Sequence, residues 1–324
     1  MRSLTIWLAS LSQLPLSGTG YADVVVPGDE AGGFSLVRLD MNQYRARNNN
    51  ARTFIERCSR YRKCRMLDAP GSFNSQAQQD VTVLRLLRNK TNGFYLDLAA
   101  NEPVFMSNTR ALERDFAWKG VCIEANPVYW VGLALQRSCT IVGAAISEGL
   151  GEVRFRGFSQ HRGKAREGGI VGYDHSENGC TNCGDFKART LPLSKVFSEL
   201  TIPSQIDYFS LDIEGAELAA MATFPFETHR FALMTVERPK PALQELLHSN
   251  GYWHVCDHGS FGDQLWVDSR ALVSTRSLLV REGPTKAPPY NSTSEVPGRR
   301  CDTHAGVKGY MEKELGKVLS GNVL

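Results

Sequence analysis

From residue 76 onward, apolar runs of strand length alternate along the chain with segments of helical periodicity. The apolar runs predict strands at residues 94–98, 120–124, 140–146, 206–212 and 231–237. The periodic segments predict helices at about residues 76–88, 108–117, 127–137, 215–223 and 241–249. Strands that alternate with helices are typical of a parallel sheet with right-handed crossovers. The pattern therefore predicts an α/β fold.

Two segments depart from this alternation. Residues 252–256 and 264–268 are short apolar runs joined by a glycine-containing turn, and they predict a C-terminal hairpin with an antiparallel edge. Residues 158–188 are rich in glycine, histidine and charged residues, and they predict a long loop inserted into the domain.

The N-terminus has the features of a secretory signal peptide. An apolar run at residues 4–14 is followed by small residues, and the run is too short to span a bilayer comfortably. We therefore expect residues 1–22 to be a signal peptide and the mature chain to have no stable membrane span. The expected localisation is the secretory pathway or the outside of the cell, with a cleaved organelle-targeting segment as the alternative. Sequons at Asn89 and Asn291 are consistent with a glycoprotein.

The flanking segments carry little periodicity. Residues 23–75 show no clear helix or strand pattern and are interpreted as a basic N-terminal extension. A cluster of arginine and lysine at residues 45–65 is better explained as a solvated segment than as a nucleic-acid site, since the net charge of the chain is only +3. Residues 269–324 contain a Pro- and Gly-rich linker and are expected to form a C-terminal arm. We expect no nucleic-acid partner, and the sequence leaves the oligomeric state open.

The chain contains eight cysteines, an even number that permits complete pairing. In a secreted protein, disulfides are the expected state of these thiols. Cys180 and Cys183 form a single C-x-x-C pair, so a four-cysteine zinc site is not expected. A solvated turn also explains the polar cluster on the predicted hairpin better than a cation site does. This cluster consists of His254, Asp257, His258 and Asp263. No metal is therefore predicted.

Four of the five predicted strands end in a carboxylate: Asp97, Glu124, Asp212 and Glu237. Ligands of open parallel sheets bind outside the carboxyl ends of the strands. The functional interpretation is strongest for Glu124 and Asp212, because each closes an apolar strand; Asp97 by itself also fits a helix cap. Glu217 needs no such explanation, since the first turn of a helix favours an acid.

Small and capping residues follow the same strand ends. The residues between Asp97 and Asn101 are short enough to allow a tight turn and the close approach of a ligand. Asn126, followed by Pro127, fits a helix N-cap and first turn. Ala145 could border a flat aromatic ring.

Four segments in this order, FYLDLAAN, GVCIEANP, DYFSLDIEGAEL and MTVERP, resemble the FkbM-type methyltransferase family. The resemblance covers roughly residues 76–268. It implies a Rossmann-like class I methyltransferase fold, with a mostly parallel seven-stranded sheet and a C-terminal antiparallel hairpin. It also implies S-adenosylmethionine as the cofactor and O-methylation of a hydroxyl as the reaction.

The resemblance also implies site residues. Asp97 and Asn101 would lie beside the methionine part of the cofactor, Glu124 would hold the ribose, and Ala145 would lie near the adenine. Asp212 would face the reaction centre. The full set of expected cofactor-binding residues is Asp97, Ala99, Asn101, Glu124, Asn126, Ala145 and Asp212.

One position departs from the family pattern. After the first strand the family has D-x-G-A-N, and in this chain Ala99 takes the place of the glycine. If the position needs a positive φ, alanine is strained there by about 1 kcal/mol. Alanine still permits close approach of a ligand.

Methyl transfer from a sulfonium depends mainly on holding the acceptor oxygen in line, and a general base adds about 100- to 10,000-fold. The expected catalytic residues are Asp212 as the base and Glu237 as its rival. His161 and His175 in the predicted loop are further rivals, although exposed histidines without a role are the simpler interpretation.

The sequence therefore predicts an O-methyltransferase whose acceptor is a hydroxyl of a glycan or small molecule. The alternative is a catalytically weak methyltransferase fold that serves as a secreted binding module. A NAD-type oxidoreductase is disfavoured, because G-x-G-x-x-G is absent after the first strand.

Overall fold

The computed structural model of the chain describes residues 21–28, 33–40, 68–158, 168–173, 183–258 and 262–270. Several predictions fall on other residues and stay predictions. They concern most of the signal peptide, the basic cluster at 45–65, the sequon at Asn291 and the C-terminal arm. His161, His175 and Cys180 also lie outside the described residues.

The core of the fold is a run of parallel strands that matches the predicted ones closely. The strands are β3 (Phe94–Leu98), β4 (Lys119–Ile123), β5 (Thr140–Val142), β10 (Gln205–Leu211) and β11 (Arg230–Val236). They lie in the order β11-β10-β3-β4-β5, so the chain leaves β3 in one direction and returns on its other side at β10. The predicted C-terminal hairpin is present as β12 (Tyr252–His258) and β13 (Asp263–Asp268), with β13 antiparallel to β11.

The expectation of a mostly parallel seven-stranded sheet needs a correction. The main sheet is mixed and has nine strands among the described residues, in the order β12-β13-β11-β10-β3-β4-β5-β1-β2. The added strands are β1 (Tyr21–Pro27) and β2 (Phe34–Asp40), which lie in the segment predicted to lack strand periodicity. Only the three valines Val24 to Val26 mark β1 in the sequence, and its place at the edge of the sheet comes from pairing with β2 and with Val142.

The predicted strand at residues 140–146 is also corrected, because it divides between two sheets. After β5 the chain turns at Gly143, and β6 (Ala145–Ile146) pairs with β9 (Cys183–Leu191) in a second sheet. A Cβ atom at position 143 would come within 2.5 Å of the Trp130 ring, so the turn requires glycine. The strand therefore ends where the chain must pass this ring.

The segment predicted as a long loop at residues 158–188 is partly a second sheet. β8 (Gly169–Ile170) and the first part of β9 lie in this segment, and β7 (Gly151–Phe158) precedes it. Together with β6 they form a four-stranded sheet in the order β6-β9-β7-β8. Glycine and charged residues hide this pairing in the sequence, because the sheet exposes much of its surface. The helix α7 (Leu193–Glu199), which follows β9, was not predicted either.

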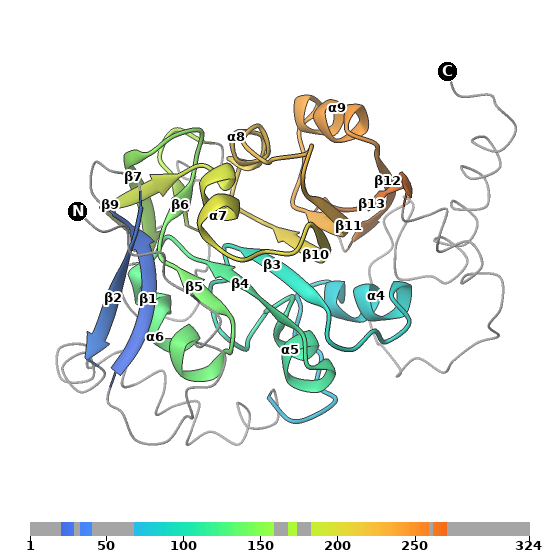
Figure 1. The fold of residues 1–324 in the computed structure, drawn as a ribbon, viewed down its shortest axis with the longest axis horizontal. Helices are drawn as coiled ribbons and strands as arrows, with labels where there is room; N and C mark the ends of the chain where they lie inside the picture. Colours follow the sequence, from blue (N-terminus) through green and yellow to red (C-terminus); the bar gives the residue numbers. More distant parts are fainter. Residues whose placement is uncertain are drawn as a thin grey trace, which may run out of the picture.

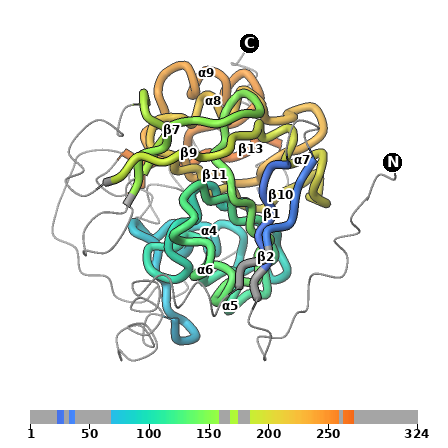
Figure 2. The backbone as a smooth tube through the Cα atoms, turned by 90° about the vertical axis from the view of Figure 1, so that its left-hand side faces the viewer, coloured from blue at the N-terminus to red at the C-terminus, as the bar shows by residue number. Residues whose placement is uncertain are grey.

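Helices cover both faces of the main sheet (Figures 1 and 2). One face carries α4 (Gln79–Leu86), α5 (Arg110–Phe116) and α6 (Pro127–Gln136), and the other carries α7, α8 (Glu217–Met221) and α9 (Pro241–Ser249). Side chains of β3 alternate between the faces, with Tyr95 in the cluster below α4–α6 and Leu96 and Leu98 in the cluster below α7–α9. The sheet is thus buried on both sides, as a parallel sheet requires.

A disulfide joins Cys122 of β4 to Cys139, which precedes β5, with a sulfur–sulfur distance of 2.00 Å. None of the cysteines in the described part of the chain is free. The sequon residue Asn89 lies exposed between α4 and β3. None of the described helices combines the length and apolar character that a membrane span needs.

Candidate functional site

A pocket of about 370 Å³ opens at the carboxyl ends of the parallel strands. It lies where the chain reverses direction across the sheet, between β3 and β10, which is the ligand position expected for an open parallel sheet. All the residues predicted from the sequence line this one pocket. They are Asp97, Ala99, Asn101, Glu124, Asn126, Ala145, Asp212 and Glu237.

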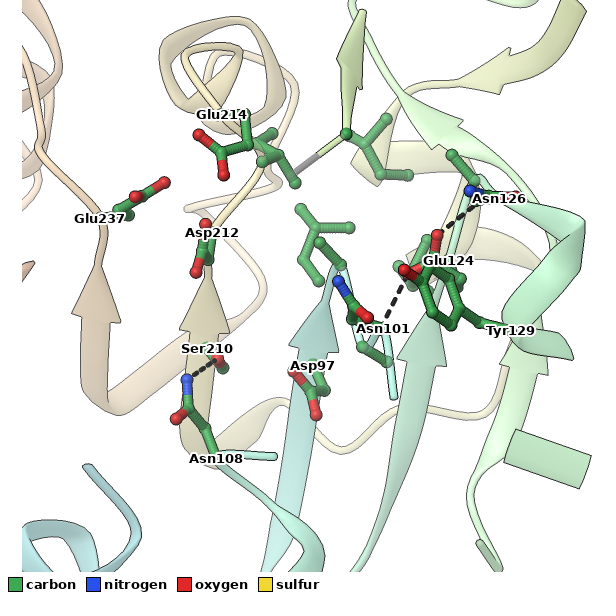
Figure 3. Close-up of a pocket in the computed structure, with 18 of the residues that line it drawn as sticks. Asp97, Asn101, Asn108, Glu124, Asn126, Tyr129, Ser210, Asp212, Glu214 and Glu237 are labelled. Atoms are coloured by element: carbon green, nitrogen blue, oxygen red, sulfur yellow. Dashed lines mark hydrogen bonds between the residues drawn. The ribbon is translucent and has the colours of Figure 1, made fainter. Parts of the chain in front are cut away.

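Glu124 follows β4, and two backbone groups fix its carboxylate. The N–H of Asn101 donates to Oε2 at 2.8 Å, and the N–H of Asn126 donates to Oε1 at 2.7 Å (Figure 3). Burial raises the pKa of Glu124 to about 7, although these two hydrogen bonds oppose the rise. Each oxygen keeps lone-pair capacity, so the carboxylate can still accept hydrogen bonds from a ligand.

The turn after β3 brings backbone into the pocket. Ala99 has a φ of +66°, and Asn101 has a φ of +49°. Both are left-handed conformations that alanine adopts only at a cost, so the expected strain at Ala99 is present. The N–H groups of Ala99 and Ala100 both donate to the carbonyl of Ile123, at 2.9 and 3.1 Å, and tie the turn to β4.

Asp97 is the most buried acid of the pocket, with an exposed fraction of 4%. It lies opposite Ser210 of β10 in the register of the sheet. Burial raises its pKa, whereas the charge of Arg137 and hydrogen bonds from Thr109 and Ser210 lower it. Burial is the largest effect, so the pKa of Asp97 lies above its ordinary value, although these three groups favour the ionised form.

Asn126 caps a helix, as its sequence context predicts, and Ala145 lies in the wall of the pocket. The Asn126 side chain accepts a hydrogen bond from the N–H of Val128 at 3.1 Å and so caps α6, with Pro127 at the first position of the helix. Ala145 is buried in β6 and packs in a cluster with Phe155 and Ile170 of the second sheet. The second sheet therefore supplies an apolar wall to the pocket beside Ala145.

Acids gather at the other end of the pocket, beyond β10 and β11. The carboxylates of Asp212, Glu214 and Glu237 point toward one another, and their oxygens lie within 4.8 Å (Figure 3). Burial raises the pKa of Glu237 well above its ordinary range, and the charges of Asp212 and Glu214 raise it further. These effects favour the protonated form of Glu237, which forms a hydrogen bond with Asp212.

Arg238 supplies positive charge to this acidic cluster. Its Nη2 contacts Glu237 and donates to Glu214 Oε2 at 3.0 Å. Three oxygen ligands so close together could hold a hard divalent cation, and within the described residues this is the one group of its kind. Since the guanidinium already neutralises part of the charge, the absence of a metal stays our prediction.

Glu217 lies outside the pocket and stabilises the turn beside it. Its buried carboxylate accepts hydrogen bonds from the N–H of Ile213 at 3.1 Å and of Gly215 at 3.0 Å. Gly215 has a φ of +104°, which glycine adopts without strain. Glu217 therefore holds the turn that positions Asp212 and Glu214.

Several pocket residues escaped the sequence analysis. Asp263 of the C-terminal hairpin lines the pocket, where burial and the charge of Asp212 raise its pKa to about 7, so the expected solvated turn is wrong for this residue. Gln79 Nε2 donates to Asp263 Oδ2 at 3.0 Å. Asn108 Nδ2 donates to Ser210 Oγ at 3.0 Å. No local motif marks Asp263 or Asn108, since only the folding of distant segments brings them to the strand ends.

Comparisons with known proteins agree with the geometry. Among solved structures, the precorrin-6y C5,15-methyltransferase from Geobacter metallireducens GS-15 is similar to this chain with 12% identity and a TM-score of 0.32. The similarity covers 61% of this chain and 90% of that chain. No curated protein matches the chain. The model of the methyltransferase FkbM domain matches residues 97–252, which contain all the predicted site residues and the acidic cluster of Asp212, Glu214 and Glu237. Residues 97–252 of the chain are therefore similar to the methyltransferase FkbM domain.

Proposed function

We propose that this methyltransferase binds S-adenosylmethionine in the strand-end pocket and methylates a hydroxyl oxygen of a glycan or small molecule. The observation that carries the proposal is the anchored, buried carboxylate of Glu124 in the same pocket as Asp97 and Asp212. The comparisons give no support to the alternative of a secreted binding module.

The donor set of the pocket fits this cofactor. The Glu124 carboxylate can accept hydrogen bonds from the two hydroxyls of a ribose, and its fixed position avoids an ordering cost on binding. Asp97 offers a negative charge to an amino group, and the turn at Ala99 to Asn101 brings backbone close. The wall formed by Ala145, Phe155 and Ile170 is apolar, as an adenine ring requires.

S-adenosylmethionine supplies an electrophilic methyl group on its sulfonium. The protein must orient the acceptor hydroxyl and take up its proton. Asp212 suits the second task, because it lines the pocket and lies beside Glu237, whose raised pKa favours its role as the donor of the hydrogen bond between them. We therefore propose Asp212 as the base and Glu237 as the acid that holds it in place.

The cofactor and the reaction are tested in two steps. Isothermal titration should show binding of S-adenosylmethionine and no binding of NAD. Transfer of a labelled methyl group should then be measured on a panel of glycans and hydroxylated small molecules, with amines and carboxylic acids as controls. Label found on nitrogen or on a carboxylate would replace O-methylation, and binding of NAD alone would remove the cofactor assignment.

We also propose that the protein acts in the secretory pathway. The composition of residues 1–22 and the pairing of Cys122 with Cys139 support this location. Fractionation of cells that express the full chain, with antibody detection and a test for removal of the N-terminal segment, would check it. A full-length, cytosolic product would contradict it.

A further inference from the structure

Asp97 is connected to a buried cation through a single hydroxyl group. Thr109 Oγ1 lies 2.5 Å from Asp97 Oδ2, and Arg137 Nη2 lies 2.6 Å from the same Thr109 oxygen. Thr109 and the side chain of Arg137 have no exposed surface. The three groups therefore form a continuous series of hydrogen bonds from the interior of the protein to the pocket.

The chemistry of the three groups decides which one donates and which one accepts in each hydrogen bond. A guanidinium has only donors, so Arg137 must donate to Thr109. The hydroxyl of Thr109 has one hydrogen, which then points to Asp97. Oδ2 of Asp97 must therefore act as an acceptor in this contact. The hydrogen bonds thus hold the Asp97 carboxyl in one fixed orientation.

The Thr109 hydroxyl bonds to Asp97 and does not cap the helix that Thr109 begins. It is the N-cap residue of α5, yet its side chain makes no capping hydrogen bond. Ser107 Oγ instead accepts from the N–H of Arg110 at 3.1 Å and of Thr109 at 3.4 Å. Since Ser107 serves the helix end, the threonine hydroxyl is left for Asp97.

Arg137 is itself held firmly in place. Its Nε donates to Glu113 Oε2 at 2.8 Å, and its Nη2 donates to the Tyr95 hydroxyl at 3.0 Å. The Tyr95 hydroxyl in turn donates to Glu113 at 2.7 Å. A buried arginine with satisfied donors cannot move toward the pocket, so its hydrogen-bonded link to Asp97 passes through Thr109.

We infer that Thr109 and Arg137 are positioning residues that orient Asp97 toward the amino group of the cofactor's amino-acid portion. This inference rests on the proposed function, because it assigns a ligand group to Asp97. It predicts that the network matters for ligands with that amino group and not for the adenosine part.

The experiment compares two ligands on matched variants by isothermal titration. S-adenosylhomocysteine carries the amino group, and 5′-methylthioadenosine has the adenosine and thioether without it. In Thr109→Val, affinity for S-adenosylhomocysteine should fall about tenfold or more, since a charge-assisted contact is lost, while affinity for 5′-methylthioadenosine changes less than about twofold. Thr109→Ser should restore the affinity.

Tyr95→Phe is the control, because it removes a hydrogen bond from Arg137 without touching the link to Asp97. It should lower stability and leave both affinities unchanged. Equal weakening of both ligands by Thr109→Val, or no weakening of either, would overturn the inference. If Thr109→Val does not fold, Thr109→Ala tests the same bond. A wild-type protein that binds neither ligand would instead overturn the proposed function, and the inference with it.

Discussion

The backbone N–H of Asn101, in the turn after β3, donates a 2.8 Å hydrogen bond to the carboxylate of Glu124 at the end of β4. The two residues come from neighbouring parallel strands, so their contact joins the two halves of the expected cofactor site. The Asn126 N–H completes the anchor from the other side.

Glu124→Ala should weaken the binding of S-adenosylmethionine by about 1–3 kcal/mol, because two ribose hydroxyls lose a charged acceptor. The pKa of Glu124 is raised to about 7, so the ionised, accepting form is lost as the pH falls below about 7. Wild-type affinity should therefore decrease between about pH 8 and about pH 6, by at most about tenfold per pH unit.

Titration calorimetry at several pH values measures both effects. In Glu124→Ala the decrease between pH 8 and pH 6 should disappear. Glu152→Ala, which removes an exposed carboxylate of β7, is the control and should behave as the wild type. An unchanged affinity in folded Glu124→Ala would sink the ribose assignment.

Asp212→Asn should lower turnover by about 100-fold or more, with little change in cofactor affinity, because the variant removes the proton acceptor and keeps the shape. Glu237→Gln should keep turnover within a few-fold, since an amide mimics the protonated carboxyl that this residue carries. Single-turnover kinetics with labelled cofactor and an acceptor from the panel separates the two.

If Glu237→Gln lowers turnover more than Asp212→Asn does, Glu237 is the base. If Asp212→Asn instead lowers cofactor affinity and excess cofactor restores the rate, Asp212 is a cofactor anchor. If neither quantity changes, Asp212 has only a structural role at the end of β10.

Ala99→Gly should raise the free energy of unfolding by about 1 kcal/mol, because glycine removes the strain of a positive φ. Ala100→Gly is the matched control at the next position, where φ is not positive, and it should lower the free energy of unfolding by about 0.5–1 kcal/mol. Denaturant unfolding measures both. A loss of stability in Ala99→Gly equal to that of Ala100→Gly would contradict the strained conformation.

Removal of the Cys122–Cys139 disulfide by a double change to alanine should lower the free energy of unfolding by about 3 kcal/mol, as expected for a cross-link across 17 residues. Titration of thiols in the unfolded, unreduced protein checks the wider expectation that most of the eight cysteines are paired. A protein in which every thiol reacts would point to a reducing compartment and would remove the secretory interpretation.

Local patterns in the sequence were sufficient for the central sheet and for most of its site. A buried strand must be apolar and must end where polar residues resume, so the sequence predicts β3 and β10 at nearly their full extent. The helical period of apolar residues likewise predicts α9. Acids that directly follow such strands must lie at the carboxyl edge of a parallel sheet. The sequence therefore predicts one shared site for four acids: Asp97, Glu124, Asp212 and Glu237.

The sequence does not predict strands whose apolar and polar residues do not alternate. β1 and β2 contain too few alternating residues to identify a strand, and β7 and β9 carry charged residues on an exposed sheet. The division of residues 140–146 between two sheets depended on the Trp130 ring against Gly143, a contact between separate elements.

The sequence by itself determined which residue types lie at the strand ends, because apolar runs indicate the buried strands and the polar residues after them indicate where each strand ends. Only the tertiary structure decided what surrounds them: Asp263 arrives from the hairpin, and Thr109 and Arg137 approach Asp97 from separate elements. The physical reason is that a hydrogen bond or a pKa depends on neighbours within a few ångströms, and the packing of distant segments sets those neighbours.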